Sequence, residues 1–174
     1  MSTVVADIGH DARAVANEFL RIAAQSGRRL TNMQLQKLVY IAHGYTLAIL
    51  HKPLVWQSVE AWRYGPVIKD LYHSLREYGA GIVTQSIPVL TYRSLPETHR
   101  DIIATVHDAY GRFTGPQLST MTHKTDTPWA KVYSPNSSWD SAIIPDDLIE
   151  EYYTQLLNER EGIRAARPTG SPRD

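Results

Sequence analysis

Residues 31–50 read TNMQLQKLVYIAHGYTLAIL, and this stretch decides the fold class. Thr31, with Gln34 three residues later, has the pattern of a capping box, in which each side chain bonds an otherwise unpaired backbone N–H at the start of a helix. Apolar residues then recur at helical spacing and form one stripe: Leu35, Leu38, Val39, Ala42, Tyr45 and Ile49. Pro53 prevents the helix from continuing. The pattern therefore predicts one long helix with an apolar face.

Two more helices are predicted on either side of this stretch. The segment 11–25 has apolar residues at helical spacing, and Gly27 provides a stop. Gly65-Pro66 predicts the start of a third helix, because proline is tolerated in the first helical turn. Its buried face would consist of Val67, Ile68, Leu71, Leu75 and Tyr78.

The second half of the chain is predicted to be helical as well. Ser94 and Glu97 have the spacing of a second capping box, which predicts a helix that ends near Gly111. Short helical turns are expected over 116–121 and 128–133. Pro145 predicts the start of a last helix, since the acidic residues 146 and 147 suit its positive end.

Extended segments are expected over 54–61 and 82–92, the latter as an edge strand or an arm, and 135–141 as a loop. The sequence thus predicts a mainly α fold: a single compact helical domain of about five main helices, short helical turns and a minor extended or β element. We expect a lead at 1–10, the domain at 11–160 and a flexible C-terminal tail at 161–174, where apolar residues are sparse.

Composition narrows the classes of function. The chain has 174 residues, 43% of them apolar, with 18 basic and 18 acidic side chains and no Cys. This balance disfavours nonspecific nucleic-acid binding, which needs clustered Lys and Arg. The lack of Cys excludes disulfides and thiolate zinc sites. Without a secretory signal or the ~20 apolar residues that span a bilayer, we expect a cytoplasmic protein with no membrane contact.

The heptapeptide 61–67, AWRYGPV, is the first candidate site. Alternate side chains of an extended segment point to opposite faces, so Trp62, Arg63 and Tyr64 cannot all be buried unless the backbone turns. One interpretation is a structural corner covered by aromatic rings. The other is a contact site for a partner, because Trp, Tyr and Arg are frequent binding hot spots. The sequence alone leaves both open.

A second constellation combines Ser119, His123 and Asp126, from which a hydrolase triad can be written. No strand–turn–helix elbow surrounds Ser119, and no oxyanion donors can be located, so catalysis is unsupported. The favoured interpretation is a hydrogen-bonded His123 that ties a short helix to the turn at Pro128-Trp129. We therefore expect no enzyme and no catalytic residues.

Cofactor and nucleic-acid sites find little support. The seven His show no metal-ligand spacing, and no glycine-rich phosphate loop is present, so no cofactor and no metal are expected. The first two helices could mimic a DNA-binding helix-turn-helix. The outer positions of the second would then be Asn32, Gln36, Lys37 and His43, which are only thinly basic.

Four motifs in order resemble the Panacea-domain family, also called SocA-like or GepA-like antitoxins. They are MQLQKLVYIAHG at 33–44, VEAWRYGPV at 59–67, LSTMTH at 118–123 with Pro128-Trp129, and Ile144 with the helix around Tyr152-Tyr153. Together they cover about residues 13–157. The last dozen residues lie outside the family pattern.

The resemblance implies a helical antitoxin that neutralises, by direct binding, a variable toxin encoded beside it. One member type is described as an adaptor that delivers its toxin to a protease, so a protease is a further partner to consider, and DNA-binding autoregulation is another alternative. On the motif positions we expect partner contacts at Trp62, Arg63, Tyr64, His123 and Trp129. Structural roles are expected for Gln36, Lys37, Tyr40, Gly65 and Pro66.

Overall fold

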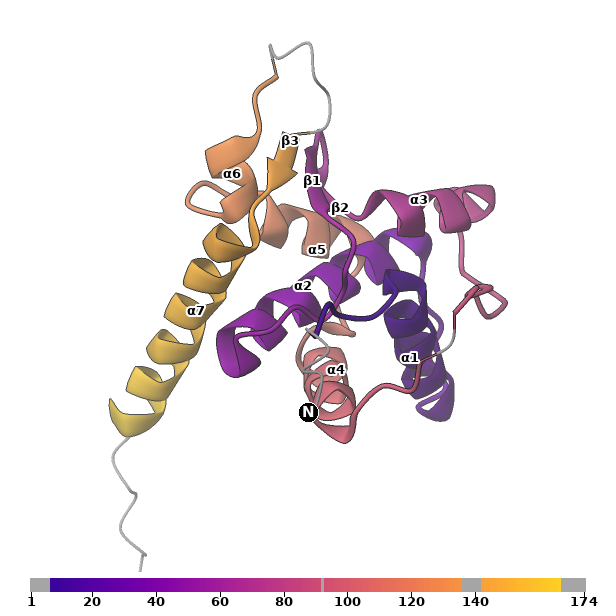
Figure 1. Ribbon diagram of the computed structural model, residues 1–174, viewed down its shortest axis with the longest axis horizontal. Helices are drawn as coiled ribbons and strands as arrows, with labels where there is room; N and C mark the ends of the chain where they lie inside the picture. Colours follow the sequence, from indigo (N-terminus) through magenta and orange to yellow (C-terminus); the bar gives the residue numbers. More distant parts are fainter. Residues whose placement is uncertain (1–6, 92, 136–141, 167–174) are drawn as a thin grey trace, which may run out of the picture.

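The computed structural model describes residues 7–91, 93–135 and 142–166. It confirms a mainly α fold with a small antiparallel sheet (Figure 1). The elements are α1 (Ala12–Gln25), α2 (Asn32–Leu50), β1 (Val59–Trp62), β2 (Gly65–Val67), α3 (Lys69–Leu75), the 3₁₀ turn η1 (Arg76–Tyr78), α4 (Glu97–Tyr110), α5 (Gly115–Thr122), α6 (Pro128–Val132), β3 (Ala142–Ile144) and α7 (Asp146–Ala166).

Helix α2 is the centre of the molecule, and α1, α4, α5 and α7 all pack against it. Its capping box is confirmed: the Thr31 hydroxyl accepts from the Gln34 N–H, and the Gln34 carboxamide accepts from the Thr31 N–H at 2.9 Å. The predicted apolar stripe is buried up to its last residue, but the expectation that only one face of the helix is buried was wrong. Residues of α2 are buried on every side, whereas Ile49 at the end of the predicted stripe is 48% exposed. A helix surrounded by other elements is buried all round.

The polar positions of α2 are therefore not on the outside. Asn32, Gln36, Lys37 and His43, expected to face solvent, are all buried, and each is held by hydrogen bonds to another part of the chain. His43, for example, bonds Asp146 of α7 through Nε2 at 2.8 Å. This placement removes the four side chains from the surface that a DNA-reading helix would present.

Helix α7 lies along α2 and extends away from the rest of the molecule at its C-terminal end (Figure 1). Gly44 permits this packing, because a Cβ there would lie 2.2 Å from Cδ2 of Tyr153. The helix continues to Ala166, beyond the expected start of the tail at residue 161. Residues 1–6, 136–141 and 167–174, which include most of the expected lead, loop and tail, lie outside the described residues.

The sheet has the strand order β2-β1-β3, and both pairs are antiparallel. Strands β1 and β2 form a hairpin in which Trp62 pairs with Gly65. The prediction that Gly65-Pro66 opens the third helix was wrong: both residues belong to β2, and α3 begins at Lys69. Gly65 has φ +109°, which is incompatible with a helix, and Pro66 is tolerated because β2 is an edge strand.

Two smaller expectations also need correction or refinement. The segment from residue 82 onward forms no regular strand in its described part; it is an arm whose Ile87 backbone is held from both sides by the Asn17 carboxamide. Ser94 does not cap α4, because Pro96 occupies the N-cap position and no side chain bonds the helix start. The short helices near 116–121 and 128–133 are confirmed as α5 and α6.

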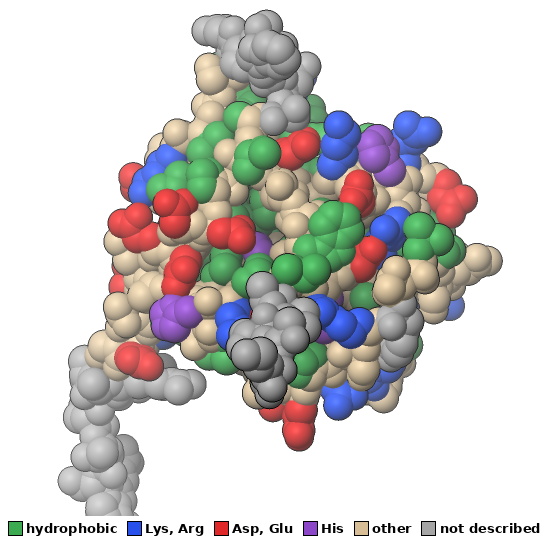
Figure 2. All heavy atoms as spheres, viewed as in Figure 1, with side chains coloured by type: hydrophobic (Ala, Val, Ile, Leu, Met, Phe, Trp, Pro, Cys, Tyr) green, Lys and Arg blue, Asp and Glu red, His purple; other side chains and the backbone are tan. Residues whose placement is uncertain are grey.

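In the described part of the chain, every helix is either too short or too polar to cross a membrane. Surface charge is mixed on the face seen in Figure 2, where acidic side chains gather along α7 and basic ones are dispersed over the remainder. No continuous basic surface covers this face.

Candidate functional site

The β1–β2 hairpin turns at Arg63 and Tyr64, and both side chains are exposed. This is the case in which the backbone turns, so the alternation argument for an extended segment no longer applies. Tyr64 is 62% exposed, and the Arg63 guanidinium lies 5.4 Å from the centre of its ring. A cation above an aromatic face is a weakly favourable pairing at an exposed site. The turn thus presents an arginine and a tyrosine together to solvent.

Trp62, by contrast, is half-buried and connects the hairpin to its surroundings. Its indole N–H donates to the Glu60 carboxylate at 2.7 Å, and its ring packs edge-on against Tyr72 of α3, with centroids 4.8 Å apart. Its backbone carbonyl accepts a 2.6 Å hydrogen bond from the indole N–H of Trp129 in α6. Trp62 is therefore part of the scaffold as well as of the surface.

Helices α5 and α6 hold the hairpin turn from the other side. The Ser119 hydroxyl donates to the Tyr64 carbonyl at 2.7 Å. His123 donates through Nδ1 to the Ser119 carbonyl, and its ring lies 5.3 Å from that of Trp129. His123 thus connects α5 to the start of α6, as the sequence suggested. The five residues proposed as partner contacts come together around one turn.

The hydrolase arrangement does not form in the described residues. The hydroxyl proton of Ser119 is directed to the Tyr64 carbonyl, and its Oγ lies 3.4 Å from Nδ1 of His123, a nitrogen that already serves the Ser119 carbonyl. Asp126 is exposed and shows no hydrogen bond to His123. Likewise, across residues 7–91, 93–135 and 142–166, no three His, Asp or Glu side chains form a metal-ligand group.

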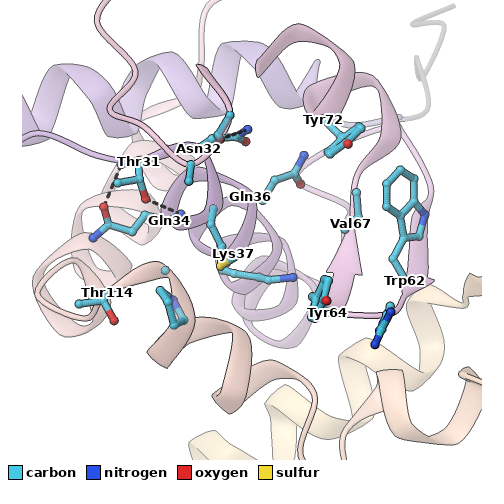
Figure 3. A pocket seen from close by; sticks show the side chains of 16 residues that line it. Thr31, Asn32, Gln34, Gln36, Lys37, Trp62, Tyr64, Val67, Tyr72 and Thr114 are labelled. Atoms are coloured by element: carbon cyan, nitrogen blue, oxygen red, sulfur yellow. Dashed lines mark hydrogen bonds between the residues drawn. The ribbon is translucent and has the colours of Figure 1, made fainter. Parts of the chain in front are cut away.

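A groove of about 790 Å³ opens beside the hairpin, between the start of α2 and the residues that lead into α5 (Figure 3). One wall consists of Trp62, Val67 and Tyr72, and the rim includes Arg63 and Tyr64. Met33 of α2 and Pro116 of α5 also line the groove. This volume is within the range of ordinary ligand pockets.

Lys37 lies within this groove. Its side chain extends from α2 towards Tyr64, as Figure 3 shows, yet the residue is only 2% exposed. Nζ donates to the Pro66 carbonyl at 2.8 Å, and no carboxylate of the described residues lies within salt-bridge distance. Burial lowers the pKa of Lys37 to about 7. Among the described residues, this buried amine therefore has no counter-ion.

Of the other residues expected to be structural, Gly65 and Pro66 lie beside this amine, whereas Gln36 and Tyr40 contact other parts of the chain. Gly65 is essential for space, because a Cβ there would lie 2.8 Å from Nζ of Lys37 and 3.3 Å from Oγ1 of Thr122. Gln36 bonds both the carbonyl and the N–H of Ile68, at 3.1 and 3.2 Å, and so fixes the chain after β2. Tyr40 is buried against Tyr153 of α7.

The sequence motif at 33–44 includes Lys37 but does not indicate that this residue lies in a groove. A usable signal was present: Lys37 is the only charged residue of α2, and apolar side chains follow it on all sides of the helix. A lysine in such a helix has to be buried or lie at an opening. Which of the two applies depends on the hairpin, which comes from a distant part of the chain.

The comparisons with known proteins place this arrangement in a family. The family model described as "Antitoxin SocA-like, Panacea domain" matches residues 35–130, which run from α2 through the hairpin to α6. The chain belongs to the SocA-like Panacea-domain antitoxins. It is 36% identical over 128 residues to Antitoxin SocA of Caulobacter vibrioides (strain NA1000 / CB15N), and the aligned part covers 68% of this chain and 68% of that protein. No solved structure matches the chain.

The family match covers both Lys37 and the hairpin. The match begins at Leu35 and therefore excludes Thr31, Asn32, Met33 and Gln34, which line one end of the groove. It also ends before α7. The groove is thus formed in large part, but not entirely, by the segment that defines the family.

Proposed function

We propose that this chain neutralises a toxin encoded beside its own gene by binding it directly in the cytoplasm, with the Arg63–Tyr64 turn at the centre of the contact. The observation that carries this proposal is that Arg63 and Tyr64 are exposed together at a turn whose backbone is held by hydrogen bonds from α5 and α6. Tyr and Arg are among the residues that contribute most to binding energy when they become buried in an interface.

Rigidity of the turn supports the same proposal. The carbonyls of Trp62 and Tyr64 both accept side-chain hydrogen bonds, from Trp129 and Ser119. A surface that is already ordered loses less conformational entropy when a partner binds. Trp129 supports the turn through the first of these bonds, and its ring is stacked on that of Tyr133 with centroids 4.4 Å apart.

The alternatives have less support. As a DNA-binding autoregulator the chain would need an outward-facing reading helix, and the polar side chains of α2 that could serve are buried. A role as an adaptor that delivers the toxin to a protease is compatible with toxin binding, and it differs in what happens to the toxin afterwards.

The proposal is tested with the product of the reading frame next to the gene of this chain. We expect this product to stop growth when expressed alone and to become harmless when this chain is co-expressed, and we expect the two purified proteins to elute together from a sizing column. A neighbour that is harmless alone, or whose toxicity persists with this chain present, would contradict the proposal.

The abundance of the toxin in co-expressing cells separates the two modes of neutralisation. Direct inhibition predicts an unchanged level of toxin bound to this chain. Delivery to a protease predicts that the level of the toxin falls although its rate of synthesis stays normal. The level should recover when the protease is removed.

A further inference from the structure

The charged residues that line the groove are all positive. Of the 16 residues that line it, Lys37 and Arg63 are cationic and none is acidic. Its main polar lining groups already have partners in the chain: the Gln34 carboxamide bonds the Thr31 N–H and the Phe113 carbonyl, and the Thr114 hydroxyl accepts from the Gln117 N–H. The remaining lining is mostly apolar. An occupant that complements this groove is therefore apolar and carries negative charge.

Lys37 shows this preference for negative charge most clearly. An ammonium group has three N–H donors, and only one of them finds an acceptor in the described structure, at the Pro66 carbonyl. Burying such a group without a counter-charge is costly, and a methionine would fill similar space without that cost. The fold nevertheless makes room for the ammonium head, because Gly65 has no Cβ to collide with Nζ. Within the described residues, the Pro66 carbonyl is the one acceptor that this charge finds.

We propose that the groove binds a segment of the toxin in which apolar side chains flank a carboxylate, and that the carboxylate pairs with Lys37. This inference rests on the proposed function and names the chemistry of the toxin surface that is recognised. The apolar side chains pack against Trp62, Val67 and Tyr72, and Arg63 at the rim attracts the approaching acidic segment.

A protein segment is the favoured occupant because the groove is continuous with the proposed contact surface. Arg63 and Tyr64 belong both to its rim and to the exposed turn. A toxin seated on the turn would lie directly above the opening, so a side chain projecting from it could enter. A free small-molecule carboxylate would use the same amine but would not need the turn.

The central experiment compares Lys37→Met with the unmodified chain in binding to the purified toxin encoded by the neighbouring frame. We expect Kd to rise at least tenfold, while the melting temperature changes little, because removal of a buried charge offsets loss of the hydrogen bond to the Pro66 carbonyl. Lys52→Met is the matched control: Lys52 is exposed just beyond the C-terminal end of α2 and does not line the groove. It should leave Kd unchanged.

The toxin side of the contact can be identified by a double-mutant cycle. Each Asp or Glu of the toxin is changed to Asn or Gln and measured against both forms of the chain. We expect one acidic position whose replacement weakens binding to the unmodified chain but has no further effect on Lys37→Met. If none of them couples to Lys37, the proposed carboxylate contact is wrong.

The pH dependence of toxin binding provides a second test of the Lys37 contact. Because the carboxylate favours the ammonium form of a lysine whose pKa is about 7, we expect Kd for the unmodified chain to rise about tenfold from pH 6 to pH 8. Arg63, the other charged group of the groove, does not titrate in this range. The pH dependence of Kd that Lys37 causes should be absent from Lys37→Met.

The results distinguish failure of the groove inference from failure of the proposed function. Equal toxin affinity of Lys37→Met and the unmodified chain overturns the groove inference and leaves neutralisation intact. Failure of the unmodified chain to bind the toxin at all contradicts the proposed function instead. If Lys37→Met does not fold, Arg63→Glu against Arg63→Lys at the exposed rim tests the same charge preference, and equal affinities of those two variants would contradict it.

Discussion

At the scale of single residues, two buried imidazoles lie outside the proposed contact surface. His10, in the segment before α1, and His99 of α4 are 4% and 3% exposed, and their rings meet edge to face with centroids 5.2 Å apart. Both ring nitrogens of His10 and Nδ1 of His99 have no hydrogen-bond partner among the described residues. Burial is the main cause that lowers the pKa of each, and the nearby Arg93 lowers both further.

These shifts predict a loss of stability in acid. The two imidazoles have pKa values below 6.5 in the folded chain and about 6.5 in the unfolded chain, so the unfolded state binds more protons between those values. The free energy of unfolding is therefore highest above pH 6.5 and falls as the pH drops below it. Asp7 opposes the shift at both residues, and Lys52 adds to it at His99. Urea midpoints between pH 5 and pH 8 measure the effect.

The double variant His10→Phe, His99→Phe is the control for this prediction, because it keeps the ring packing and removes both titrations. Its urea midpoint should vary less between pH 5 and pH 6.5 than that of the unmodified chain. Identical slopes for the two proteins would show that other groups cause the acid sensitivity.

At the scale of elements, the packing of α7 on α2 depends on the absence of a side chain at Gly44. We expect Gly44→Ala to lower the free energy of unfolding by about 1–3 kcal/mol, because its Cβ would overlap the Tyr153 ring, which is fully enclosed and cannot give way cheaply. Gly162→Ala on α7 is the matched control: no atom lies within 4 Å of its added Cβ, so it should stabilise the helix slightly or not at all. Thermal melts decide, and a Gly44→Ala midpoint at or above that of Gly162→Ala would contradict the packing argument.

The helices illustrate which elements sequence patterns can predict. The capping box at Thr31 and the end before Pro53 are local signals, and the helix they define was predicted to within one or two residues. Gly65-Pro66 carried the same kind of local signal for a helix start, but pairing with β1 placed it in a strand. The burial of Gln36 and Lys37 could not be predicted either, because it depends on a hairpin and an α5 that approach from elsewhere in the chain. The residues of the candidate contact were therefore predictable, and the groove beside them was not.

At the scale of the whole molecule, the hairpin joins the scaffold and the proposed interface, and two of its aromatics separate those roles. Tyr64 is exposed with the Arg63 guanidinium over its ring, whereas Trp62 joins β1 to α3 and α6. Truncation of a core Trp to Ala costs about 3–5 kcal/mol. We expect a smaller but clear loss for Trp62→Ala, because part of that ring is solvent-exposed. Its loss of toxin binding would then follow from a disturbed turn.

Tyr64→Ala should behave differently. We expect an unchanged melting temperature and a rise in Kd for the toxin of about tenfold or more, the effect of removing an interface hot spot. Trp56→Ala provides the comparison, because Trp56 is a similarly exposed aromatic, at 53%, that does not line the groove. Its removal should affect neither quantity. If Tyr64→Ala and Trp56→Ala weaken toxin binding equally, the contact extends over the general surface rather than centring on the turn. If neither does, the toxin binds a different face, and the fixed turn serves the scaffold alone.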